Sequence, residues 1–289
     1  MGLTRMVLVV LMLGLLAFLV TLTFRSRRVV PADLAMERAL RRTNTTTAIA
    51  ALGGLGFAAW GWSSFPTVYV SATEVPGLLA ALGPALAGLV FLAVTAAGES
   101  TWPRPAGSYR AAHLERRPLF SRPQSWAARA LWTWTALLAA LLVLFGAIAE
   151  PDGRSIAHGP GVGECLADGV PVPCGGGASG PFPGWPYGLP MLLGAALVVA
   201  ATLGVLHVVA RRPAVRGTSA EDDALLRTIS ATRVVRGAQL SQGTALAGVT
   251  FFAGATSANA GWWWAWPLLI LAVVVLGTAL GVALRRVAP

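Results

Sequence analysis

The chain has 289 residues, of which 55% are hydrophobic and only 12% are charged. A soluble globular domain carries about a quarter charged residues, so this composition excludes an ordinary soluble fold and requires lipid around the protein. The formal net charge is +10, and every basic residue is arginine.

Apolar residues fall in seven blocks, each near the ~20 residues that a helix needs to cross a ~30 Å hydrocarbon layer. The predicted fold class is therefore all-α: a polytopic membrane helical bundle of seven transmembrane helices, forming a single transmembrane domain over residues 1–289. The predicted spans are residues 6–24, 46–62, 76–97, 130–149, 189–209, 240–254 and 262–284.

The first span could be mistaken for a secretory signal, because Arg5 precedes its apolar run. No small-residue cleavage site follows it, and Arg25, Arg27 and Arg28 come straight after the run. We therefore expect an uncleaved anchor that enters the membrane N-terminus first.

Two short cytoplasmic helices are expected before the second and sixth spans. Residues 31–42 place acidic residues early and arginines late, the order that complements a helix dipole. Residues 219–236 are similar, with Ser219 as a cap and Asp222 three residues later. We expect both helices to run on into the spans that follow them.

A short sequence echo links these two regions, Ala39-Leu40-Arg41-Arg42-Thr43 and Ala224-Leu225-Leu226-Arg227-Thr228. With the fourth span as a linker, it suggests a three-plus-one-plus-three layout like that of parallel-repeat transporters.

Two larger loops interrupt the spans. Residues 98–129 form a Pro- and Arg-rich cytoplasmic loop, and residues 150–188 form an extracytoplasmic Gly- and Pro-rich loop. The outer loop holds Cys165 and Cys174, which we expect to form a disulfide outside the cell. A metal site there would use His158 and nearby acids, but the spacing matches no zinc pattern.

The arginines decide the orientation, because arginine beside a span is retained in the cytoplasm. Seven spans put twenty arginines on one side and only Arg5 and Arg154 on the other. This predicts an external N-terminus, a cytoplasmic C-terminus, and a basic face that attracts anionic lipid at about 1 kcal/mol per arginine. No nucleic-acid-binding module is present. The expected lipid contacts are Arg25, Arg27, Arg28, Arg211, Arg212, Arg285 and Arg286.

Small residues at helical spacing predict faces where helices approach closely, with partners in this chain or in another. These residues are Gly277, Gly281, Gly53, Gly56, Thr244 and Gly248. The sixth span is only weakly apolar, so a re-entrant segment stays open as an alternative. A possible polar cavity would be lined by Thr46, Gln242, Thr244 and Thr250.

No catalytic, cofactor or metal constellation stands out. Neither G-x-S-x-G nor H-E-x-x-H occurs, and a retinal Schiff base is excluded because the chain has no lysine. No acidic or basic residue is expected deep in a span, and His207 lies near the inner surface, so coupled ion transport lacks its usual carriers. We expect a protein that is not an enzyme and binds no cofactor.

The arginine-only basic set and the segment Gly98-Glu99-Ser100-Thr101-Trp102-Pro103-Arg104-Pro105 resemble uncharacterised multi-pass membrane proteins of high-GC actinobacteria. That resemblance implies a bacterial cytoplasmic membrane and no particular activity. The function expected from the residues is an accessory or scaffold subunit of a larger membrane assembly, with a membrane-protein partner or a second copy. The alternative is a small-solute or lipid transporter component. A polar cavity would favour the transporter, and a filled bundle would favour the subunit.

Overall fold

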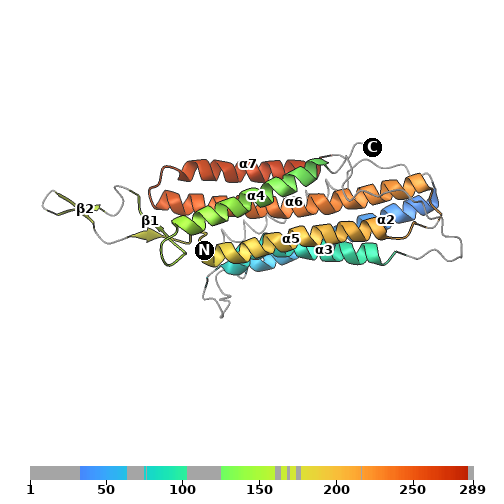
Figure 1. Cartoon of the computed structure of the whole chain (residues 1–289), viewed down its shortest axis with the longest axis horizontal. Helices are drawn as coiled ribbons and strands as arrows, with labels where there is room; N and C mark the ends of the chain where they lie inside the picture. The colour runs from blue at the N-terminus through green and yellow to red at the C-terminus, as the bar shows by residue number, and fades with distance from the viewer. Residues whose placement is uncertain are drawn as a thin grey trace.

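A computed structural model describes residues 33–63, 75, 77–102, 125–159, 164–167, 170–173, 177–215 and 217–285. These residues form six helices that lie side by side along the long axis of the molecule, with short strands at one end (Figure 1). The helices are α2 (Leu34–Ser63), α3 (Leu78–Ser100), α4 (Ser125–Ile148), α5 (Trp185–Arg211), α6 (Ala220–Asn259) and α7 (Ala265–Leu284). The predicted helical bundle is confirmed for this part of the chain.

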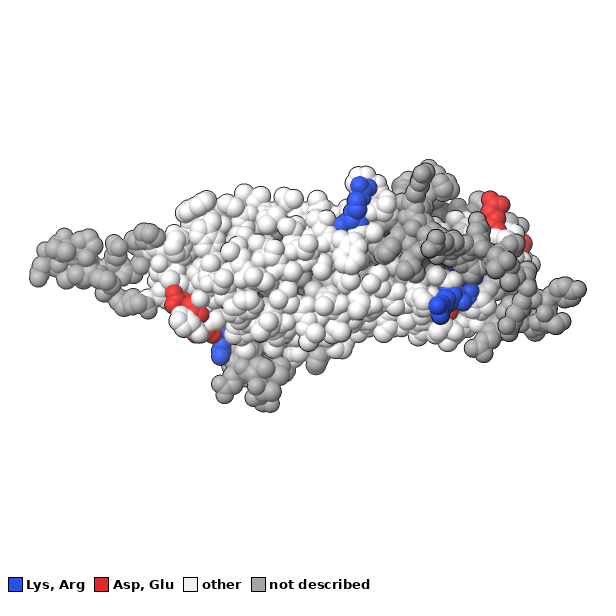
Figure 2. All heavy atoms as spheres, in the orientation of Figure 1, with Lys and Arg blue, Asp and Glu red and all other residues white. Residues whose placement is uncertain are grey.

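Four of these helices, α3, α4, α5 and α7, are long and apolar enough to cross a membrane. Their outward side chains are large and apolar, as Leu193 of α5 and Val273 of α7 illustrate with 62% and 73% exposure. Figure 2 shows a broad uncharged surface, with a few charged side chains at one end of it and further charged side chains from about mid-length towards the other end. The chain is therefore an integral membrane protein.

Helix α6 is the longest element and occupies the centre of the bundle. It packs against α3, α4, α5 and α7, and also touches α2. Its 40 residues correspond to about 60 Å at 1.5 Å per residue, roughly twice the thickness of the hydrocarbon layer. Because neighbouring helices shield α6 from lipid, it carries more polar residues than the four outer helices do.

The predicted spans compare closely with the observed helices. The segments predicted as the second and sixth spans lie inside the longer helices α2 and α6, so the expected continuation of a preceding short helix into each segment is confirmed, whereas their crossing of the membrane stays a prediction. Asp33 caps α2 by accepting a hydrogen bond from the Met36 amide at 2.7 Å. Ser219 caps α6 by accepting one from the Asp222 amide at 3.0 Å, as its spacing predicted. The first predicted span, residues 6–24, lies outside the described residues.

The helices alternate in direction, which sorts the charges. Helices α2, α4 and α6 begin at the end where α3, α5 and α7 finish. This end, called the Arg end below, holds ten of the eleven arginines that the structure describes. The opposite end carries Arg154 with Glu150 and Asp152, and is called the strand end below.

The strand end is formed by the segment between α4 and α5. Strand β1 (Ile156–Ala157) pairs antiparallel with β4 (Ala178–Ser179), and β2 (Glu164–Ala167) pairs with β3 (Val170–Pro173). Phe182 is fully buried and meets Phe145 of α4 edge to face, with ring centroids 5.4 Å apart. Thr256 donates to the Pro181 carbonyl at 2.6 Å, so this segment is attached directly to α6.

Candidate functional site: a buried charged cluster

Charged side chains from several helices meet inside the Arg end. Glu99 is in the last turn of α3, Arg212 follows α5, and Asp223 and Arg227 lie in the first two turns of α6. Glu99, Arg212 and Asp223 are only 5%, 4% and 7% exposed. Burying a charged group costs free energy unless the group is paired with an opposite charge. These three side chains therefore need ion pairs to remain buried.

Arg212 lies at the centre of the cluster. Its Nε is 3.6 Å from Glu99 Oε2, and its Nη2 is 3.7 Å from Asp223 Oδ1. The guanidinium stacks over the Trp102 ring at 4.6 Å, and the Trp102 indole N–H donates to Glu99 at 3.0 Å. Burial lowers the pKa of Arg212, and the two carboxylates partly offset that shift. The side chain makes ion pairs with both acids, although its nitrogens have no hydrogen bond among the described residues.

Arg227 of the cluster and the nearby Arg42 donate hydrogen bonds to backbone carbonyls at the C-terminal ends of helices. Arg227 pairs with Asp223 at 2.7 Å and donates to the Val209 and Ala210 carbonyls of α5, each at 3.1 Å. Arg42 of α2 donates to the Thr101 carbonyl at 2.8 Å, just beyond α3. Helix C-termini leave carbonyls without intrahelical partners and carry a partial negative charge. Cationic side chains therefore stabilise α3 and α5 there.

The turn before α6 positions Asp223. The Ser219 cap starts the helix, and the Val215 amide donates to Asp223 Oδ1 at 3.2 Å. A small apolar core of Met36, Ala39, Trp102 and Leu226 packs beside this turn. The Asp223 carboxylate thus accepts a hydrogen bond from the α5–α6 connection and forms ion pairs with both Arg212 and Arg227.

The central part of α6 uses its polar side chains in a similar way. Gln239 donates to the Ala279 carbonyl of α7, and Gln242 donates to the Ala195 carbonyl of α5, both at 2.9 Å. Ser241 donates to the Pro84 carbonyl of α3 at 2.8 Å. Three polar residues within about one helical turn therefore connect α6 to three different neighbours.

The residues predicted to line a polar cavity are not gathered around one. Thr46 of α2 occupies the space that a Cβ on Gly98 of α3 would take. Thr244 and Thr250 donate to carbonyls of α6 itself. Gln242 instead lines a small cavity between other residues.

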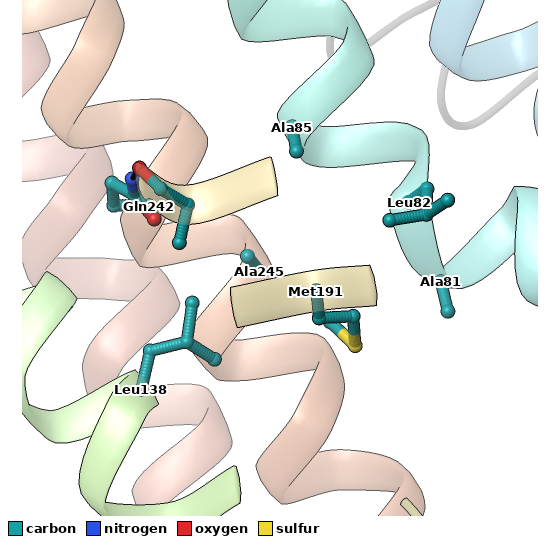
Figure 3. A pocket seen from close by; sticks show the side chains of 8 residues that line it. Ala81, Leu82, Ala85, Leu138, Met191, Gln242 and Ala245 are labelled. Carbon is teal, nitrogen blue, oxygen red and sulfur yellow. Dashed lines mark hydrogen bonds between the residues drawn. The ribbon is translucent and has the colours of Figure 1, made fainter. Parts of the chain in front are cut away.

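That cavity lies between α3, α4, α5 and α6 and measures about 10 Å³, roughly the space of one water molecule. Its walls are mostly apolar, as Figure 3 shows for Ala85, Leu138, Met191, Gln242 and Ala245. In this part of the chain the bundle is filled rather than hollow.

The small residues divide into packed and open positions. Gly53 contacts Val90 of α3, and a Cβ there would lie 3.4 Å from it. A Cβ added to Gly56, Gly248, Gly277 or Gly281 would meet nothing within 4 Å. The closest helix contacts use other glycines, among them Gly54, Gly88, Gly146, Gly237, Gly243 and Gly254.

The remaining predicted site residues have different outcomes. Cys165 lies in β2, but Cys174 is outside the described residues, so their disulfide remains a prediction. Arg211 and Arg285 are exposed at the Arg end, where lipid can reach them. Arg212 is inside the cluster instead, out of reach of a headgroup. Arg25, Arg27, Arg28 and Arg286 are outside the described residues.

Sequence reasoning missed the cluster because its members are far apart in the chain and were assigned to separate loops. One signal was available: Glu99 is the single acid in an otherwise apolar helix, three residues before Trp102. Within the described ranges, no three His, Cys, Asp or Glu side chains come together as a metal site. No protein-family model, curated protein or solved structure matches the chain.

Proposed function

We propose that this protein crosses a bacterial cytoplasmic membrane seven times, with the Arg end in the cytoplasm. The sorting of ten described arginines to one end supports this orientation. In this arrangement α2 and α6 cross together with the four more apolar helices, and residues 6–24 supply the remaining span. The first turns of α2 and α6 then project into the cytoplasm.

Within that membrane, the proposed function is that of a non-enzymatic accessory or scaffold subunit of a larger assembly. The observation that carries the proposal is how the polar side chains of α6 are used. Gln239, Ser241 and Gln242 each donate to the backbone of a neighbouring helix. Hydrogen bonds of this kind hold membrane helices together and leave these groups committed to the fold rather than to a solute.

A surface for a partner helix is proposed on α7. Gly277 and Gly281 are exposed, and no atom of the described residues lies within 4 Å of a Cβ added at either. Small residues four apart let a second helix approach closely. A helix from another subunit, or from a second copy, would fit against this face.

Purification from native membranes in a mild detergent tests the proposal. We expect a stoichiometric membrane-protein companion, or a homo-oligomer, identified by mass spectrometry and size. Replacing Gly277 and Gly281 by Ile should remove that companion. The control Leu276→Ile changes an exposed residue on a different face of α7 and should keep it. A monomer that leaves the membrane without any companion would contradict the subunit function.

The rival proposal is a small-solute or lipid transporter component with the three-plus-one-plus-three layout. The observation in its favour is the polar Gln242 amide beside the mid-bundle cavity. Against the internal repeat, α6 is central and α2 packs mainly on α3, so the two echoed helices differ in surroundings. A bulky residue in the cavity, such as Ala245→Leu, should abolish transport under the rival proposal and leave assembly unchanged.

A further inference from the structure

Two tryptophans at the Arg end are each contacted by two arginines. Arg42 and Arg212 lie over the Trp102 ring, 4.9 Å and 4.6 Å from its centroid. Arg129 and Arg285 lie over the Trp126 ring, 4.2 Å and 5.0 Å from its centroid. In both cases the two guanidiniums come from different parts of the chain, so each ring brings two positive charges together.

The two arrangements differ in how their charge is balanced. Trp102 is 8% exposed, and its indole N–H donates to Glu99, which also forms an ion pair with Arg212. Trp126 is 58% exposed. Among the described residues, no carboxylate lies within ion-pair distance of Arg129 or Arg285. In the first pair Arg212 forms ion pairs with two carboxylates, whereas neither arginine of the second pair has a described counter-charge.

The position of Trp126 indicates where a counter-charge would come from. Trp126 is the second residue of α4, and Arg285 directly follows α7. Figure 2 shows basic side chains near the ends of these helices, at the border of the uncharged surface. The first turn of α4 adds backbone N–H groups without intrahelical acceptors, and the positive end of its dipole. An anion bound between the start of α4 and the end of α7 would lie at the edge of the apolar surface of the protein.

We propose that Trp126, Arg129 and Arg285 form a binding site for the headgroup of an anionic phospholipid. The phosphate accepts hydrogen bonds from both guanidiniums, which are better suited than ammonium groups to phosphate. The acyl chains lie along the exposed apolar residues one to three turns away, such as Trp132 of α4 and Leu276 of α7. A zwitterionic lipid would balance the two charges less well, so the site selects for net negative lipid.

Competition between lipids in native mass spectrometry tests the site. The full chain is reconstituted with equal amounts of phosphatidylglycerol and phosphatidylcholine, and retained lipids are counted. We expect preferential retention of phosphatidylglycerol, reduced about tenfold in the double variant Arg129→Gln/Arg285→Gln, because each arginine near the surface strengthens anionic-lipid binding severalfold. The matched control Arg38→Gln/Arg41→Gln removes two exposed charges from the same end and should leave retention unchanged.

Three further measurements test the proposal even if the double variant does not fold. Arg129→Lys/Arg285→Lys retains the charge and should keep most of the preference. Trp126→Leu removes the ring that orders both guanidiniums and should reduce retention about threefold. Inorganic phosphate in excess should not displace the lipid, since it lacks acyl chains. Unchanged retention in both the Gln and Leu variants, or full displacement by free phosphate, would overturn the proposal.

Discussion

Adjacent arginines at the end of α5 have opposite surroundings. Arg211 is exposed, whereas Arg212 is 4% exposed and lies between Glu99 and Asp223. Removing a guanidinium from water costs several kcal/mol, which a pair of carboxylates offsets only while all the partners remain. The same substitution at positions 211 and 212 therefore compares the loss of an exposed arginine with the loss of a buried one.

We expect Arg212→Met to lower the free energy of unfolding by about 3–5 kcal/mol, because it leaves Glu99 buried without its cation. Arg211→Met should change it by less than about 1 kcal/mol. Both are measured by denaturant titration in detergent micelles. The double variant Glu99→Gln/Arg212→Met removes both charges and should recover part of the loss. Equal effects at 211 and 212 would show that the cluster contributes nothing to stability.

At the scale of helices, two glycines of α6 differ in the space beside them. A Cβ on Gly243 would lie 2.5 Å from the Ala279 Cβ of α7, while one on Gly248 would meet no described atom within 4 Å. Overpacking a filled interface costs about 1–3 kcal/mol, whereas Gly→Ala in a helix with room gains about 0.5–1 kcal/mol. Gly243→Ala and Gly248→Ala should therefore change the free energy of unfolding in opposite directions.

Thermal unfolding of the two variants in the same detergent provides the comparison. The expected order of midpoints is Gly248→Ala at or above the parent chain, and Gly243→Ala below it. If both substitutions lowered the midpoint equally, the close contact between Gly243 and Ala279 would not be a constraint on the bundle.

The helices were more predictable from the sequence than their contacts. Caps such as Ser219 and apolar runs such as that of α5 are local signals, so they predicted elements to within a few residues. Helix α6 was harder, because its middle is too polar to mark a span, and only its place among five neighbours explains why. The cluster around Arg212 depends on contacts between residues more than a hundred positions apart, which no local pattern contains.

For the whole molecule, different interactions hold the two ends together. Charged side chains connect helices at the Arg end, whereas an aromatic contact attaches the strand end to α4 and a hydrogen bond attaches it to α6. On the face that Figure 2 shows, a broad uncharged surface lies between the charged side chains. The proposed direction across the membrane follows from the arginines, because arginine beside a span is retained in the cytoplasm.

That direction can be tested with two matched alanines, Ala157 in β1 at the strand end and Ala220 at the start of α6, both exposed. Each is replaced by cysteine, and intact cells are treated with a membrane-impermeant maleimide, with the parent chain as background. We expect Ala157→Cys to be labelled at once and Ala220→Cys only after permeabilisation, because arginines beside membrane spans are generally retained in the cytoplasm. Labelling of Ala220→Cys in intact cells would place the arginines outside. The lipid site at Trp126 would then face the other leaflet.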